Sequence, residues 1–154
     1  MNFFKVKSYA KLNLSLNVIK KKSKKLHVIE SLVTFINFYD LIYIREIKAI
    51  KHKIKFLGKF SKNITKNNTV GNLLNLLDEK NLLKGKKFEI KIIKNIPQKS
   101  GMGGGSMNAS SIIKYLLKKK IINSSKKSIN NIMKSIGSDV PLGMNLKNTI
   151  MSQT

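Results

Sequence analysis

The stretch SGMGGGSMNAS, residues 100–110, places four of the chain's nine glycines within five positions. Before it, FEIKIIKNI at residues 88–96 is apolar and β-branched, as in a buried strand. After it, apolar residues recur at three- and four-residue spacings, which predicts a helix over about 109–120. A strand, a glycine turn and a helix in this order predict an anion site. The first N–H groups of a helix lack partners within it, and glycines let a phosphate come close to the backbone.

Two well-known phosphate loops do not match this stretch. A Walker A loop ends in Gly-Lys-Ser/Thr, whereas here Gly105 is followed by Ser106 and Met107. The dinucleotide fingerprint, started at Gly101, needs glycine or alanine where Ser106 stands. A plain flexible connection would also favour glycine and serine. We favour phosphate binding, because a predicted strand and a predicted helix flank the turn.

The bulk composition predicts a single folded domain. The chain has 154 residues, of which 42% are hydrophobic and 25% charged, and it has no cysteine. Disulfides, thiolate metal sites and a cysteine nucleophile are therefore excluded. His27 and His52 are the only histidines, too few for the usual zinc ligand sets. The first residues lack a signal-like apolar segment, and no run of 18 apolar residues occurs, so we expect a cytoplasmic protein without a membrane partner.

The net charge of +24 would attract polyanions such as nucleic acid. However, Arg45 is the only arginine among 31 basic residues, and arginine is preferred for recognising bases and phosphates. The lysines accompany many asparagines and isoleucines, all of which have A/T-rich codons. We therefore favour compositional drift over a selected nucleic-acid surface and expect no specific nucleic-acid partner. A basic RNA-binding module remains the alternative.

The remaining pattern predicts an α+β domain in which a mixed or antiparallel sheet packs against helices. Alternating or β-branched segments predict strands at residues 3–10, 11–19, 27–38, 41–47 and 52–57, with a further strand starting near the end of the chain. Helical spacing predicts one helix from an Asn68 or Thr69 cap towards Gly85, and another from Ser124 or Ser125 to Gly137. The run SDVPLGMN, residues 138–145, is expected to be a loop.

Two further residues are weak candidates for a functional role when each is taken alone. Lys11 lies at the start of the second predicted strand, and a single lysine in so basic a chain is normally exposed. Asp139 is one of three aspartates and lies in GSDVP, where an acid is often only a turn-former.

Three separated segments nevertheless resemble the motifs of the GHMP small-molecule kinases in order and spacing: YAKLNLSLNV, IPQKSGMGGGSMNAS and IGSDVPLGM. The triple glycine followed by Ser-x-Asn-Ala is most similar to the branch that phosphorylates the 2-hydroxyl group of 4-diphosphocytidyl-2-C-methyl-D-erythritol. That reaction belongs to non-mevalonate isoprenoid synthesis. The resemblance implies an ATP-dependent kinase with a GHMP N-terminal domain, in which a glycine-rich phosphate loop leads into a helix.

The resemblance also implies a role for each matching residue. Lys11 and Asp139 would be catalytic, with Asp139 accepting or orienting the proton of the substrate hydroxyl. Asn13 and His27 would contact the substrate, His27 at the cytosine ring. Mg²⁺ would accompany ATP, and no residue is assigned as a metal ligand. The ATP phosphates would be held by Pro97, Gln98, Lys99, Ser100, Gly101, Met102, Gly103, Gly104, Gly105, Ser106 and Met107.

Two departures from the family pattern stand out. Leu26 replaces the aromatic residue that would stack on cytosine. Family members are also nearly twice as long, so residues 1–154 would form only the N-terminal, ATP-binding domain. We expect a missing C-terminal half as a partner, and an inactive truncated remnant of the kinase remains a further alternative.

Overall fold

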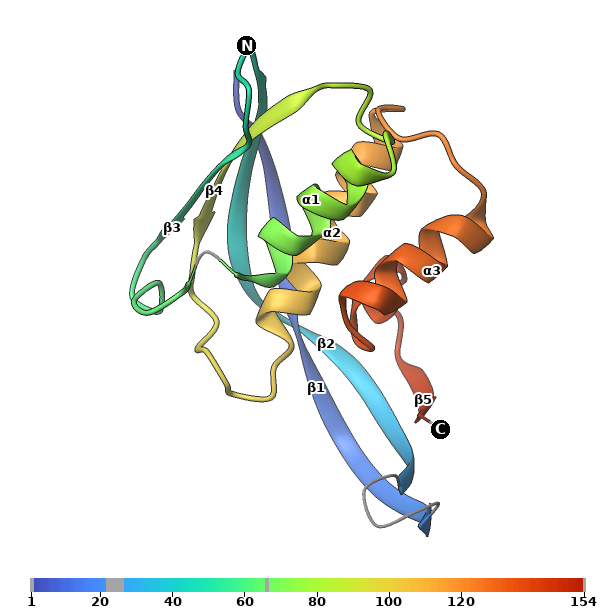
Figure 1. The fold of residues 1–154 in the computed structure, drawn as a ribbon. Helices are drawn as coiled ribbons and strands as arrows, with labels where there is room; N and C mark the ends of the chain where they lie inside the picture. The colour runs from blue at the N-terminus through green and yellow to red at the C-terminus, as the bar shows by residue number, and fades with distance from the viewer. Residues whose placement is uncertain (1, 22–26, 66, 154) are drawn as a thin grey trace.

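A computed structural model describes residues 2–21, 27–65 and 67–153 of the chain. It contains one sheet with helices packed on one face (Figure 1). The elements in chain order are β1 (Phe4–Lys21), β2 (His27–Ile47), β3 (Lys53–Leu57), α1 (Thr69–Glu79), β4 (Lys87–Ile93), α2 (Gly104–Lys118), α3 (Lys126–Ile136), the 3₁₀ helix η1 (Val140–Met144) and β5 (Thr149–Gln153). Among the described residues, no helix is both long and apolar enough to span a bilayer.

The sheet is built around the long strand β2. Strand β1 pairs antiparallel with it on one side. On the other side β4 pairs antiparallel with residues 41–47, and β5 pairs antiparallel with residues 29–33. Strand β3 pairs with β4 in parallel, so the sheet is mixed. These pairings confirm the predicted α+β class.

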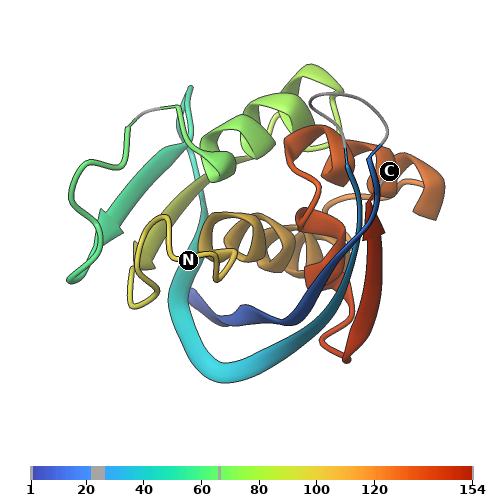
Figure 2. The same ribbon diagram turned by 90° about the horizontal axis from the view of Figure 1, so that it is seen from below.

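The core lies between the sheet and the helices. Figure 2 shows α2 lying within the curve of β1 and β2, with α1 and α3 beside it. Inward-facing residues of β2 and β4 meet the apolar stripes of the three helices, and each fully buried aliphatic or aromatic side chain stabilises the fold by about 1.5–3 kcal/mol. The largest fully buried side chains are Ile42, Ile44, Leu73, Leu74, Leu77, Leu83, Phe88, Ile90, Ile92, Ile96, Met107 and Ile112.

Two predicted helix starts are confirmed by their caps. The side chain of Asn68 accepts a hydrogen bond from the N–H of Gly71, at 2.9 Å, and so begins α1. The Ser125 hydroxyl accepts one from the N–H of Ser128, at 3.2 Å, and begins α3. Both side chains satisfy N–H groups that the helix itself leaves without a partner.

The strand predictions were wrong in their number. Residues 3–10 and 11–19 were expected to form two strands but belong to the single strand β1, and 27–38 and 41–47 likewise form the single strand β2. The reason is a bulge: Tyr9 pairs with Tyr39 while Ala10 pairs with Ile36, so the register shifts without breaking the ladder. Leu14, in the second of these segments, lies at a further register shift between Asn13 and Ser15 and is 60% exposed.

Three other predicted boundaries need correction. Helix α1 ends at Glu79 rather than near Gly85, because Asn81 and Lys84 adopt left-handed backbone conformations in the turn that follows. Helix α2 begins inside the glycine run, at Gly104. The predicted loop at 138–145 contains the helix η1. The terminal strand prediction is confirmed by β5.

Candidate active site

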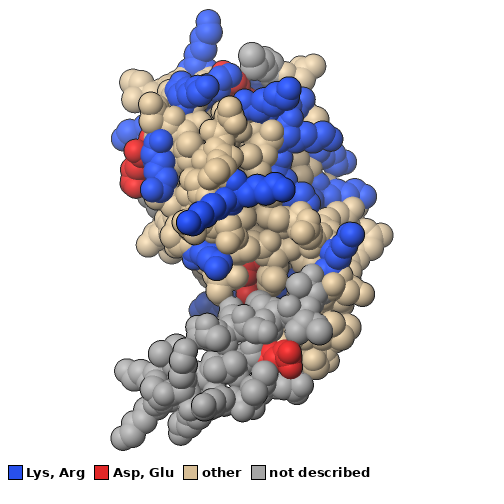
Figure 3. Space-filling model, turned by 90° about the vertical axis from the view of Figure 1, so that its right-hand side faces the viewer, with Lys and Arg blue, Asp and Glu red and all other residues tan. Residues whose placement is uncertain are grey.

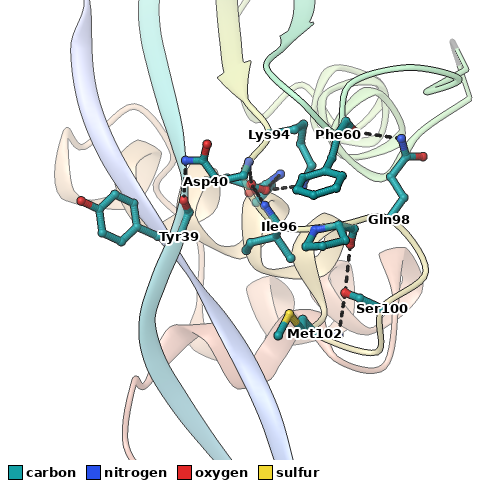
Figure 4. A network of polar contacts seen from close by, with 11 residues as sticks. Tyr39, Asp40, Phe60, Lys94, Ile96, Gln98, Ser100 and Met102 are labelled. Atoms are coloured by element: carbon teal, nitrogen blue, oxygen red, sulfur yellow. Dashed lines mark hydrogen bonds and ion pairs between the residues drawn. The ribbon is translucent and has the colours of Figure 1, made fainter.

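The glycine-rich stretch forms a tight loop between β4 and α2. Gly103 is the N-cap of α2 and has φ 65°, and Gly101 has φ 75°, a conformation that residues with a side chain rarely adopt. The loop is fixed from within, because the Ser100 hydroxyl donates to the carbonyl oxygen of Pro97 at 2.9 Å (Figure 4). From outside, the Gln98 side-chain amide donates to the carbonyl oxygen of Phe60 at 2.8 Å.

The glycines also allow close approach to neighbouring elements. A Cβ atom added to Gly103 would lie 3.0 Å from Cγ of Lys11. One added to Gly105 would lie 3.0 Å from the hydroxyl oxygen of Thr69, at the start of α1. The first turns of α1 and α2 therefore approach each other closely at Gly105, where any side chain would require Thr69 to shift.

A pocket of 530 Å³ opens beside this loop. It is bounded by the loop, by the start of α1 and by the exit of β4. The helix starts bring the positive ends of two helix dipoles to the pocket, and no side chain caps the start of α2, so the pocket favours an anionic ligand. The residues that line it are Phe56, Asn63, Ile64, Thr65, Asn67, Asn68, Thr69, Val70, Lys94, Pro97, Gln98, Lys99, Ser100, Gly101, Met102, Gly103, Gly104, Gly105, Ser106, Asn108 and Asp139.

Lys11 contacts Asp139, which lines this pocket, although 128 positions separate the two residues in the sequence. Nζ of Lys11 lies 2.9 Å from Oδ2 of Asp139 and donates to Oδ1 of Asn13 at 3.1 Å. Lys11 is only 3% exposed, whereas the Asp139 side chain is 25% exposed. The backbone N–H of Lys11 also donates to the carbonyl oxygen of Met102, at 3.1 Å, which ties β1 to the loop. A buried cation thus holds an accessible carboxylate beside the glycine loop.

The other predicted site residues are placed as follows. Ten of the eleven loop residues, Pro97 to Ser106, line the pocket. The eleventh, Met107, is 1% exposed and packs towards Gly143, so its side chain lies in the core. Asn13 is exposed and contacts Lys11. The side chain of His27 and the whole of Leu26 lie outside the part of the chain that the structure describes.

Sequence reasoning missed two charged residues beneath the loop. Lys94 lines the pocket and forms an ion pair with Asp40, which is fully buried. Lys94 is one lysine among many, and Asp40 lies in a strand-like apolar segment, so no local pattern distinguishes either. Asn67 and Asn68 also line the pocket, and only the capping role of Asn68 had a sequence signal.

Comparison with known proteins shows the family to which this chain belongs. The family described as "GHMP kinases N terminal domain" matches residues 68–147, which include the loop and Asp139. The chain therefore belongs to the GHMP kinases and carries the fold of their N-terminal domain.

Particular members of this family are similar over most of the chain. The 4-diphosphocytidyl-2-C-methyl-D-erythritol kinase of Pelagibacter ubique is 58% identical over 94% of this chain and 51% of its own length. The enzyme of the same name from Clostridioides difficile is 33% identical over 92% of this chain and 47% of its own. The chain thus spans about half the length of these relatives.

Solved structures support the same fold. A crystal structure of 4-(cytidine 5'-diphospho)-2C-methyl-D-erythritol kinase superposes with a TM-score of 0.79 at 19% identity. The superposition covers 97% of this chain and 52% of that protein. Mevalonate kinase from Staphylococcus aureus superposes with a TM-score of 0.57 at 12% identity, over 88% of this chain and 45% of its own. These likenesses establish the predicted mixed-sheet fold with its glycine loop and helix.

Proposed function

We propose that this chain is the ATP-binding domain, residues 1–154, of a kinase that phosphorylates the 2-hydroxyl group of 4-diphosphocytidyl-2-C-methyl-D-erythritol. The reaction would serve non-mevalonate isoprenoid synthesis in the cytoplasm. The names of the similar enzymes support the choice of substrate. The observation that carries the proposal is the 2.9 Å contact between Lys11 and Asp139 at a pocket formed by the glycine loop.

The loop suits a triphosphate for physical reasons. Phosphoryl transfer asks the protein mainly to position the groups and to neutralise charge. Backbone N–H groups at the start of α2 would hold the ATP phosphates, with the loop residues from Pro97 to Ser106 around them. Within the described residues, no group of three or more His, Asp or Glu side chains could hold a metal ion. Mg²⁺ would accompany ATP.

Asp139 and Lys11 would act on the substrate hydroxyl. The Asp139 carboxylate would accept or orient the hydroxyl proton as that oxygen attacks the terminal phosphate. The Lys11 ammonium group would orient this carboxylate and would stabilise negative charge on the attacking oxygen. Asn13 would contact the substrate beside Lys11, and His27 would bind the cytosine ring. A C-terminal half, on the same chain or a separate one, would complete the substrate side of the site.

The test is phosphoryl transfer from Mg-ATP to 4-diphosphocytidyl-2-C-methyl-D-erythritol, followed by ³¹P NMR. We expect a new phosphomonoester signal whose appearance requires Asp139. If Mg-ATP binds but no transfer occurs, even with a C-terminal domain supplied, the chain is an inactive remnant. If Mg-ATP does not bind at all, the kinase proposal is wrong.

The RNA-binding alternative has one supporting observation, the excess of lysine. Figure 3 shows lysine and arginine side chains over much of one face, with few acidic ones among them. Binding that depends only on this charge would weaken steeply as salt is added. The kinase proposal instead predicts that single-stranded RNA does not displace Mg-ATP from the pocket at physiological salt.

A further inference from the structure

Asp40, in β2, is a charged residue in a place where charge is costly. It is 0% exposed and pairs with Lys94, which is also buried. Removing an ion pair from water costs several kcal/mol per ion unless further hydrogen bonds compensate. An apolar side chain at this core position would avoid that cost, so the presence of a carboxylate here needs an explanation, which its contacts provide.

The carboxylate of Asp40 accepts hydrogen bonds from four groups (Figure 4). Oδ1 accepts from the backbone N–H groups of Asn95, at 2.8 Å, and Ile96, at 2.9 Å. Oδ2 accepts from Nζ of Lys94 and from the side-chain amide of Asn108, the latter at 3.1 Å. Each oxygen therefore accepts from two donors: Oδ1 binds only the segment that follows β4, and Oδ2 binds both that segment, through Lys94, and α2, through Asn108.

These donors lie on the two sides of the glycine loop. Asn95 and Ile96 come immediately before Pro97, where the loop begins. Asn108 lies in the second turn of α2, just after the loop ends. One carboxylate thus joins the entry and the exit of the loop to the rigid centre of the sheet.

Lys94 adds a second consequence of the same contact. A Cβ atom on Gly104 would lie 3.1 Å from Nζ of Lys94, so the ammonium group lies directly against the first residue of α2. The hydrogen bond that Lys94 donates to Asp40 therefore also fixes the position of this ammonium group at the wall of the pocket.

We propose that Asp40 is a positioning residue that holds both ends of the glycine loop and Lys94 in place, so that the loop is already shaped for a phosphate before one binds. The link to phosphate rests on the proposed function. The effect on the loop itself does not, and it can be measured in the free protein.

The variant Asp40→Asn should affect the two sides of the loop differently. The remaining amide oxygen can still accept from Asn95 and Ile96, whereas the new NH₂ group faces two other donors, Lys94 and Asn108. Asp78→Asn is the matched control. Asp78 also contacts a lysine and a second polar group, Lys87 and His52, but these lie at the other end of β4.

The first measurement is amide hydrogen exchange without nucleotide, at a temperature where circular dichroism shows both variants folded. Because a buried donor without a partner costs about 1–3 kcal/mol, exchange over residues 101–106 should accelerate by about 10-fold or more in Asp40→Asn. In Asp78→Asn it should match the unmodified protein. Equal exchange in Asp40→Asn and the unmodified protein would overturn the proposal, and so would equal acceleration in both variants.

The second measurement is the Kd for Mg-ATP. It should rise by about 10-fold in Asp40→Asn and stay unchanged in Asp78→Asn. An unchanged Kd in Asp40→Asn would refute the link to phosphate binding. If the unmodified protein binds no Mg-ATP, the proposed function fails, while the exchange measurement still decides the role of Asp40.

A second variant serves if Asp40→Asn does not fold. Asn108→Ala removes a single donor to Asp40 and should accelerate exchange in the first turn of α2. Unchanged exchange in Asn108→Ala would overturn the proposal.

Discussion

The two ends of β4 carry clusters of similar composition that do different things. At its carboxyl end, Asp40 and Lys94 lie beneath the glycine loop and next to an open pocket. At its amino end, Asp78 contacts Lys87 and His52, and the His52 ring stacks on Phe88 at an interplanar angle of 7°. Each cluster has a carboxylate and a lysine, but the Asp40 carboxylate also accepts two backbone N–H groups beside the pocket, whereas the Asp78 carboxylate contacts the side chains of Lys87 and His52. Surroundings rather than residue types distinguish a binding site from a structural contact.

The largest expected effect comes from the carboxylate at the pocket. Asp139→Asn should lower turnover by about 10²–10⁴-fold, because an amide cannot accept the substrate proton. Affinity for Mg-ATP should change little, since the loop amides are untouched. Steady-state kinetics and isothermal calorimetry measure the two effects separately, with Asp78→Asn as the control. Retained turnover would remove Asp139 from the mechanism.

A smaller effect is expected from the loop glycines, and the chain offers a matched pair. Gly103 and Gly85 both have positive φ, 65° and 76°, so alanine at either costs about 1–2 kcal/mol of folding stability. Only at Gly103 would the new Cβ meet Lys11, at 3.0 Å, since nothing lies within 4 Å of Gly85. Gly103→Ala should therefore weaken Mg-ATP binding while Gly85→Ala leaves it intact. Equal affinities in the two variants would show that this contact is irrelevant to the site.

The smallest effect concerns pH and the cluster at the amino end of β4. Nδ1 of His52 accepts from the N–H of Phe88 at 3.0 Å, so the neutral ring carries its proton on Nε2, 3.1 Å from Asp78. Burial lowers the pKa of His52 below its ordinary value of 6.5; the positive charge of Lys87 acts in the same direction, while Asp78 opposes the shift. The unfolded chain then binds more protons, so stability from this group is present above pH 6.5 and is lost as the pH falls towards the folded-state pKa.

Chemical denaturation between about pH 5 and pH 7 tests this expectation. The loss of stability on acidification should shrink in His52→Gln, in which His27 is the only remaining histidine. A loss of the same size in His52→Gln would assign the pH dependence to other groups. Mg-ATP affinity in His52→Gln should stay unchanged, which separates this cluster from the pocket.

The parts of the fold that sequence predicted are those set by local patterns. Glycines between a strand and a helix predicted the loop. Polar residues before apolar stripes predicted one cap at Asn68 or Thr69 and another at Ser124 or Ser125, and the structure has Asn68 and Ser125. Lys11 and Asp139 became candidates only through their motifs, because neither stands out by local physical chemistry. The structure brings them to 2.9 Å, although the chemical roles given to them remain predictions.

What sequence could not predict depends on register and long-range pairing. The β1 and β2 segments join into single strands because a bulge between Tyr9 and Ala10 is accommodated by the partner strand. The contact between Asp40 and Lys94 spans 54 positions and follows from how the two strands align. The early end of α1 depends on left-handed residues in the following turn, for which asparagine gives only a weak signal.

The central claim is that a triphosphate binds at the glycine loop beside Asp139. Hydrogen exchange followed with and without saturating Mg-ATP tests it most directly. We expect slower exchange over residues 101–106 and at the start of α1, with the amides around His52 unchanged. Unchanged exchange over the loop at saturating Mg-ATP would contradict the claim.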